Sequence, residues 1–208
     1  MGGGSGQRFG RPKQYELIGD ERIIDRSRRI AAAASDGVVV VVPAADAERE
    51  VAVAGGDTRS ESVRAGLAEV PDDCDVICIH DAARPLASVE LFRAVIGAIG
   101  PDVDGAVPGV PVADTIKIVD ESGAVVDTPE RSSLMAVQTP QAFRAAALRA
   151  AHRGAAEGTD DASLVEAAGG RVVVVAGEPT NRKVTHPDDL AWVRSAIMAG
   201  GPVRALEE

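Results

Sequence analysis

The chain is organised around its first residues, Met1-Gly2-Gly3-Gly4-Ser5-Gly6-Gln7-Arg8-Phe9-Gly10-Arg11-Pro12-Lys13. Glycine has no Cβ, so a loop this rich in glycine can turn its backbone N–H groups inward around a phosphate. Two cations, Arg8 and Lys13, follow the glycines and can neutralise such an anion. The stretch therefore predicts a loop that binds a polyphosphate.

The spacing of this loop fits neither of two common phosphate-binding motifs. A P-loop ends in Gly-Lys followed by Ser or Thr, which is missing here. A dinucleotide fingerprint carries no basic tail of the kind formed by Arg8 and Lys13. Runs of Gly and Ser also occur in flexible linkers, and on these residues alone that alternative stays open.

The length of 208 residues indicates one domain, or one domain with a small appendage, and we treat residues 1–208 as a single domain. Its core is expected to consist of Val, Ala, Leu and Ile, because aromatics make up only 2% of the chain. A formal net charge of −10 argues against nonspecific binding of nucleic acid or of an anionic membrane. We find no apolar run of about 20 residues and no leader-like stretch. The C-x-x-x-C pair of cysteines favours a reducing compartment over a zinc site, so we expect a cytoplasmic protein.

Apolar β-branched runs alternate with amphipathic stretches, as expected for an α/β fold with a parallel sheet. We expect strands at 38–42, 51–54, 75–80 and 171–176, and helices at 23–35, 46–50, 59–70, 89–100, from 139 onward, from about 159 onward and from 187 onward. Residues 105–112 are expected to be a short extended stretch broken by prolines.

One segment departs from this alternation. Residues 114–120 alternate in polarity, Glu121-Ser122-Gly123 forms a turn, and residues 124–127 return, which predicts a β-hairpin. We expect residues 113–131 to project from the sheet as an arm that a second copy of the chain covers.

Two loops that follow predicted strands carry polar groups. Gly55-Gly56-Asp57-Thr58 leads into a helix, whose N-terminus suits an anionic or polar ligand. His80-Asp81-Ala82-Ala83-Arg84-Pro85 follows another strand, and ligands in open α/β sheets bind beyond the carboxyl ends of strands. Asp81 could orient a metal–phosphate complex or a ribose hydroxyl, whereas we interpret His80 as a satisfied, partly buried residue. An ordinary βα loop remains the alternative for residues 55–62.

Lysine is rare in this chain. Among 22 basic residues only Lys13, Lys117 and Lys183 are lysine, so each lysine marks a candidate position for a compact charge. Chance retention of each lysine is the alternative, and Lys117 has no role that the sequence supports.

Five blocks in one order carry a resemblance to a known family. They are Gly-Ser-Gly-x-Arg-Phe-Gly, Pro-Lys-Gln-Tyr, His-Asp-Ala-Ala-Arg-Pro, Thr-Pro-Gln, and Asn-x-Lys-Val-Thr-x-Pro-x-Asp-Leu. Over residues 2 to about 198 the chain resembles the 2-C-methyl-D-erythritol 4-phosphate cytidylyltransferases of the non-mevalonate isoprenoid pathway. The resemblance implies a Rossmann-like nucleotidyltransferase fold, a homodimer, and Mg²⁺-dependent transfer of CMP from CTP to methylerythritol phosphate with release of pyrophosphate.

The resemblance also implies roles for individual residues. Arg8, Lys13 and Lys183 would be catalytic, and Asp81 would lie beside the ribose, the metal and the substrate. The nucleotide would be bound by Gly3, Gly4, Ser5, Gly6, Gly56, Asp57, Arg59, Ser62, Asp81 and Ala82. The acceptor would be contacted by Asp81, Arg84, Thr139 and Lys183, and by Thr115 and Arg131 reaching in from the partner subunit.

The chain departs from the family pattern at its start. In the family the glycine loop follows a buried hydrophobic strand in the middle of the sheet, whereas here it follows Met1 directly. Such a strand contributes on the order of 10 kcal/mol of apolar burial, so we expect this first strand to be missing and the true start to lie upstream. Two other hypotheses stay open: a cytidylyltransferase for ribitol 5-phosphate, and an inactive nucleotide-binding module.

Overall fold

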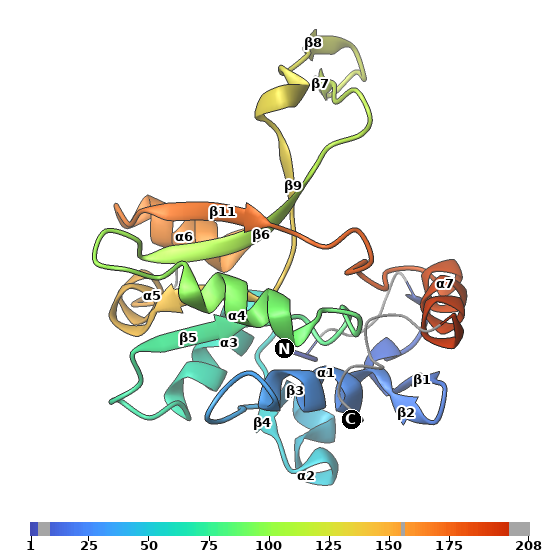
Figure 1. The fold of residues 1–208 in the computed structure, drawn as a ribbon, viewed down its shortest axis with the longest axis vertical. Helices are drawn as coiled ribbons and strands as arrows, with labels where there is room; N and C mark the ends of the chain where they lie inside the picture. Colours follow the sequence, from blue (N-terminus) through green and yellow to red (C-terminus); the bar gives the residue numbers. More distant parts are fainter. Residues whose placement is uncertain (4–8, 155–156, 200–208) are drawn as a thin grey trace.

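The computed structural model describes residues 1–3, 9–154 and 157–199 and has an α/β fold (Figure 1). Its main sheet contains the strands β11 (Val172–Ala176), β6 (Gly105–Pro111), β10 (Gln141–Arg144) and β5 (Val76–Ile79), in that order. β11 is parallel to β6, whereas β10 is antiparallel to both of its neighbours. β9 (Met135–Val137) pairs with the far end of β6. The sheet is therefore mixed, where the sequence predicts a parallel one.

Two sequence predictions need correction in this sheet. Residues 105–111 are extended, as predicted, but they are not broken: they form β6, a seven-residue strand inside the sheet, because its pairing does not require the N–H groups that Pro108 and Pro111 lack. The Pro108 carbonyl, for example, accepts the Gln138 N–H at 2.7 Å. The segment from 139 onward was expected to be helical, yet β10 precedes the helix α5 (Ala145–Ala151).

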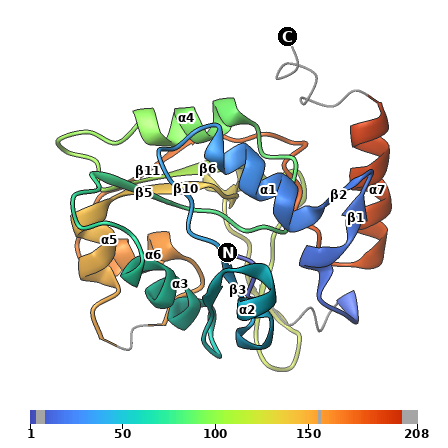
Figure 2. The ribbon, with the colours of Figure 1, turned by 90° about the horizontal axis from the view of Figure 1, so that it is seen from below.

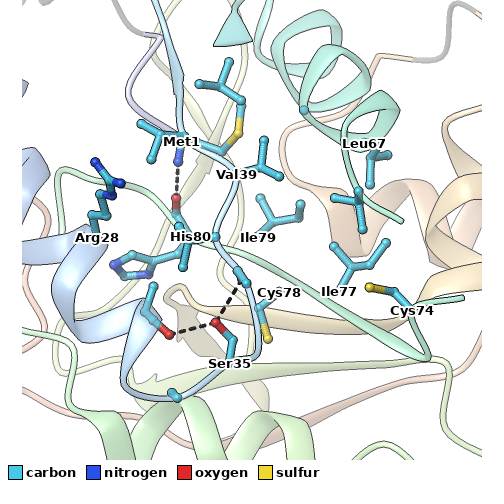
Figure 3. A pocket seen from close by; sticks show the side chains of 18 of the residues that line it. Met1, Arg28, Ser35, Val39, Leu67, Cys74, Ile77, Cys78, Ile79 and His80 are labelled. Carbon is cyan, nitrogen blue, oxygen red and sulfur yellow. Dashed lines mark hydrogen bonds between the residues drawn. The ribbon is translucent and has the colours of Figure 1, made fainter. Parts of the chain in front are cut away.

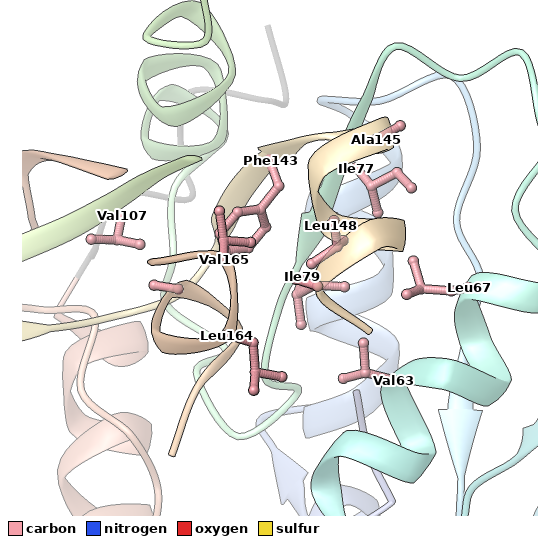
Figure 4. Close-up of a cluster of buried hydrophobic side chains, with 12 residues drawn as sticks. Val63, Leu67, Ile77, Ile79, Val107, Phe143, Ala145, Leu148, Leu164 and Val165 are labelled. Atoms are coloured by element: carbon pink, nitrogen blue, oxygen red, sulfur yellow. The ribbon is translucent and has the colours of Figure 1, made fainter. Parts of the chain in front are cut away.

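Helices cover both faces of the sheet (Figure 2). α1 (Ile23–Ala32) and α4 (Val89–Gly97) lie on one face, and α3 (Arg59–Ala68), α5 and α6 (Asp161–Ala167) lie on the other. The core beneath α3, α5 and α6 is built from small aliphatic side chains and one Phe, as the composition predicts (Figure 4). It includes Val63, Leu67, Ile77, Ile79, Phe143, Leu148, Leu164 and Val165.

A cavity separates β5 from the strand pair β3 (Val41–Val42) and β4 (Val53–Ala54). Its volume is about 760 Å³, and Val39 lies across it from Ile77 and Ile79 (Figure 3). Within the described residues no strand pairs with β5 on this side. The predicted strand 38–42 consequently pairs only over its last two residues.

Met1 and Gly2 occupy one end of the gap. The Met1 amino group donates to the His80 carbonyl at 2.7 Å, and the Ala82 N–H donates to the Met1 carbonyl at 2.9 Å. On the other side, the Gly2 N–H donates to the Val41 carbonyl at 2.7 Å. The start of the glycine stretch is therefore bonded between β3 and the end of β5.

The predicted arm is present. β7 (Ile118–Val119) and β8 (Val125–Asp127) form a short antiparallel hairpin that, with the 3₁₀ turn η4 (Arg131–Ser133), projects away from the sheet (Figure 1). Asp120 stabilises its turn by accepting the backbone N–H groups of Ser122 and Ala124. Several large apolar side chains of the arm are exposed: Ile116, Ile118, Val119, Val125 and Val126.

The remaining elements are η2 (Lys13–Tyr15), β1 (Leu17–Ile18), β2 (Glu21–Arg22), η3 (Ala44–Asp46), α2 (Ala47–Glu50) and α7 (Pro187–Met198). α7 packs on β1 through Val193 and Ile18, as part of a second apolar cluster. Among the described helices, none is long and apolar enough to cross a membrane.

Candidate active site

Asp81 and Lys183 form the centre of the candidate site, just beyond the carboxyl end of β5. The Lys183 Nζ lies 2.6 Å from Asp81 Oδ2, and the two side chains are 41% and 14% exposed. Burial opposes ionisation of the Asp81 carboxyl. The nearby ammonium of Lys183 outweighs burial, together with Arg59 and the Met1 amino group, and holds the pKa of Asp81 well below its usual range. Asp81 is therefore an anion that already carries a cation partner.

The loop that carries Lys183 is held against the end of the sheet. The fully buried Asn181 amide donates to the Thr139 carbonyl at 2.9 Å and to Gln138 Oε1 at 3.2 Å. The Val184 N–H donates to the Ala83 carbonyl at 2.8 Å. The sequence analysis gave Asn181 no role, although it belongs to the block that contains Lys183. Its burial, which no local pattern reveals, makes it the anchor of this loop.

His80 and Thr139 belong to one hydrogen-bond network. A carbonyl only accepts, so His80 Nε2 donates to the Arg84 carbonyl at 3.2 Å, and Nδ1 accepts the Thr139 hydroxyl proton at 3.1 Å. The same hydroxyl oxygen accepts the Asp81 N–H at 3.0 Å. Burial and the Met1 amino group lower the pKa of His80 to about 3. The interpretation of His80 as a satisfied buried residue is confirmed, and Thr139 has no hydroxyl proton left to donate to a ligand.

Arg84 presents a cation that carbonyl groups hold in place. Its guanidinium donates to the Asn181 carbonyl at 2.7 Å and to the Val137 carbonyl at 3.4 Å. Burial lowers the pKa of Arg84, and Asp81 partly opposes this change. Within the described residues no carboxylate lies within ion-pair distance of Arg84. Its positive charge therefore remains available to an anionic ligand.

The glycine stretch lies against the loop at the start of α3. A Cβ on Gly3 would lie 3.2 Å from Ser62 Oγ, and a Cβ on Gly56 would lie 2.4 Å from the Glu61 Cβ. Ser62 is buried and donates to the Thr58 carbonyl at 3.0 Å. The structure thus brings Gly3, Gly56 and Ser62 together. Ser62 supports the loop from inside, whereas Asp57 is exposed.

The other predicted residues fall into three groups. Lys13 opens η2 and is half-buried, and Ala82 is buried beside Met1. Gly4, Ser5, Gly6 and Arg8 lie outside the described residues. Thr115 and Arg131 are exposed on the arm, where Arg131 donates to the Ala113 carbonyl at 2.9 Å, and the arm projects away from this site (Figure 1).

A carboxylate–lysine pair, an arginine held by carbonyl groups, and a glycine segment at the start of a helix are features typical of α/β proteins that bind phosphate groups. Comparison with known proteins sharpens this class. Residues 1–199 match the sequence profile of 2-C-methyl-D-erythritol 4-phosphate cytidylyltransferase. The chain belongs to this enzyme family, as its motifs predict.

Individual relatives agree. A 2-C-methyl-D-erythritol 4-phosphate cytidylyltransferase of Rhodococcus jostii is 44% identical over 211 residues, covering 95% of this chain and 92% of the relative. The bifunctional enzyme IspD/IspF of Oleidesulfovibrio alaskensis is 49% identical over 150 residues, covering 70% of this chain but only 37% of the relative. The crystal structure of the cytidylyltransferase from Thermus thermophilus superposes with a TM-score of 0.79 at 33% identity, covering 90% of this chain and 94% of that one.

Proposed function

We propose that this protein transfers CMP from CTP to 2-C-methyl-D-erythritol 4-phosphate, forming 4-diphosphocytidyl-2-C-methyl-D-erythritol and pyrophosphate for isoprenoid precursor synthesis. Membership of the cytidylyltransferase family over residues 1–199 carries the proposal. The Asp81–Lys183 pair beside the glycine stretch supports it, because it provides a charged site for a nucleotide at the end of β5.

The chemistry needs no general base. The acceptor phosphate is already an oxyanion near neutral pH, since its second pKa is about 6. One of its oxygens attacks the α-phosphorus of CTP, the bond from that phosphorus to the β-phosphate oxygen breaks, and pyrophosphate leaves. The protein therefore acts by positioning two anions and neutralising their charge.

The cations of the site divide this work. Arg8 and Lys13 would neutralise the triphosphate on the glycine loop, and Lys183 would stabilise the charge that develops between the two substrates. Arg84, whose guanidinium bonds carbonyl groups of Asn181 and Val137, is suited to bind the acceptor phosphate. Thr139 would act through its bonds to His80 and Asp81, or accept a hydrogen bond from a hydroxyl group of methylerythritol phosphate, because its own proton is already donated.

Magnesium fits this site only as part of a nucleotide complex. Within the described residues no cluster of three or more His, Cys, Asp or Glu side chains could hold a metal. Mg²⁺ in such sites is bound by one or two carboxylates together with substrate phosphates. Asp81, with one oxygen bonded to Lys183, would supply its second oxygen. When bound, the ion would neutralise phosphate charge.

We also propose a homodimer joined through the arm. Water is an unfavourable environment for the exposed apolar residues of β7, β8 and their flanks. A second copy that covered them would shield this surface and bring Thr115 and Arg131 to the partner's site. A cytoplasmic location is the last part of the proposal, and it is supported by two cysteines that are both free.

A coupled pyrophosphate-release assay tests the proposed function. We expect release that requires both CTP and methylerythritol phosphate, with little or none when ribitol 5-phosphate is the acceptor. Preference for ribitol 5-phosphate would overturn the acceptor. CTP binding without turnover on either acceptor would favour the alternative of an inactive nucleotide-binding module.

A further inference from the structure

Arg59 occupies a position that its own helix does not favour. It is the first residue of α3, and the N-terminus of a helix carries a partial positive charge that repels a cation. The helix already has its own cap, since Thr58 accepts the Glu61 N–H and Glu61 accepts the Thr58 N–H. The presence of a cation here therefore needs another explanation.

A buried carboxylate compensates this charge. The Arg59 guanidinium lies 2.6 Å from Asp161 Oδ2, and the Asp161 side chain is fully buried. The second oxygen, Oδ1, accepts a hydrogen bond from His152 Nε2 at 3.0 Å, and the His152 side chain is only 2% exposed. Both oxygens of Asp161 are thus bonded, which is the condition under which a buried carboxylate is tolerated.

The first turn of α3, which Arg59 begins, lies beside the glycine stretch. Ser62 belongs to this turn, and a Cβ on Gly3 would lie 3.2 Å from the Ser62 Oγ. Arg59 is 30% exposed, whereas Asp161 behind it is inaccessible. Asp161 is the first residue of α6, and His152 follows the last residue of α5; both helices lie on the same face of the sheet as α3.

We propose that Asp161, supported by His152, is a positioning residue that fixes the Arg59 guanidinium at the nucleotide site. This inference rests on the proposed function, because it takes CTP as the ligand that Arg59 contacts. Asp161 touches neither substrate and acts through Arg59. The relation explains why a cation is placed at a helix N-terminus and why a carboxylate is buried behind it.

Calorimetric titration of CTP and steady-state kinetics test the proposal with Asp161→Asn. The Asn side chain keeps the shape but loses the charge, and its amide group must face either Arg59 or His152, both donors. We expect the dissociation constant and the KM for CTP to rise about tenfold, the effect of losing a charged hydrogen bond. We expect kcat to change less than about threefold, because contact with bound CTP persists into the transition state.

Two controls separate positioning from a general loss of structure. Asp160→Asn removes the neighbouring carboxylate, which caps α6 by accepting the Ser163 N–H at 2.9 Å, and Asn caps equally well. Asp160 bonds Ser163 and Gln141 and acts on Arg59 only through its charge, so this variant should raise the KM for CTP by less than about twofold, well below the effect of Asp161→Asn. In an Arg59→Ala background, Asp161→Asn should add no further increase, because the two residues act as one unit.

Unchanged CTP affinity in Asp161→Asn, or independent, multiplying effects in the double variant, would overturn the inference. Should Asp161→Asn fail to fold, His152→Leu serves instead. It keeps the carboxylate but removes the Nε2 donor to Asp161 Oδ1, and an unchanged affinity in that variant would again overturn the proposal. If the wild-type protein binds CTP without transferring CMP, the proposed function fails while the binding series still decides the role of Asp161. If it does not bind CTP, both fail.

Discussion

Replacing Lys183 by Met should destabilise the protein and abolish most of its activity. Met keeps an unbranched side chain that reaches as far as the Lys Cε but removes the ammonium that lies 2.6 Å from Asp81. Loss of one partner from a fully buried ion pair costs about 3–5 kcal/mol, and an exposed pair contributes about 0–1 kcal/mol. Because Asp81 is 14% and Lys183 41% exposed, we expect an intermediate loss of about 2 kcal/mol at pH 7.

The destabilisation should depend on pH in a defined direction. The pKa of Asp81 is depressed in the folded state, so the pair contributes fully above the unfolded-state pKa of about 3.9 and less as the pH falls below it. The difference in unfolding free energy between wild type and Lys183→Met should therefore shrink below about pH 4. Urea denaturation at a series of pH values measures it.

Lys117→Met provides the matched control. Lys117 is an exposed lysine on the arm that donates to the Thr128 hydroxyl at 2.8 Å, and its loss should change stability by less than about 0.5 kcal/mol. Turnover should fall about 100-fold or more in Lys183→Met, the effect of removing a group that stabilises transition-state charge. A stability difference that stayed constant or grew as the pH fell, or turnover equal to that of Lys117→Met, would refute this reasoning.

Three further predictions concern other parts of the molecule. Thr139→Val removes the hydroxyl that joins His80 to the Asp81 N–H, so it should lower the free energy of unfolding by about 1–3 kcal/mol in denaturant melts. Thr139→Ser keeps the hydroxyl and should retain most of this stability. Equal stability of the two variants would count against the hydrogen-bond network. Fusion of about five Val and Ile residues before Met1 should raise the melting temperature by filling the cavity beside β5. A Gly-Ser fusion of equal length should not raise it. Equal melting temperatures of the two fusions would show that the cavity does not accept a strand. The double variant Ile118→Asp, Val125→Asp places charges on the exposed apolar arm and should convert a dimer to a monomer in sedimentation velocity. The melting temperature of the monomer should stay close to normal. An unchanged sedimentation coefficient would exclude the arm as the dimer interface.

Local signals predict the helices well. The start of α3 follows from Thr58 and Glu61, and the start of α7 follows from Pro187, because caps and an N-terminal proline act within one turn. The strands are harder to predict. Pro108 and Pro111 suggest a broken segment, yet β6 lies at the centre of the sheet, since pairing partners far away in the sequence decide its conformation.

The same distinction between local and long-range signals applies to the residues of the site. Asp81, Arg84 and Lys183 can be predicted because they stand in short polar blocks that follow strands. Asp161, His152 and Asn181 cannot, because an acidic residue at a helix start or an Asn in a loop is ordinary until the fold buries it. Ser62 and Thr139 are found by their blocks, but only the structure reveals that their hydroxyl groups bond inside the protein.

Transfer of isotopic label tests the central claim most directly. With CTP labelled at the α-phosphorus and methylerythritol phosphate as acceptor, we predict that the label enters the sugar-alcohol product, while label at the γ-phosphorus leaves in pyrophosphate. Label from the γ-position in the acceptor, or α-label recovered only as free CMP, would contradict cytidylyl transfer.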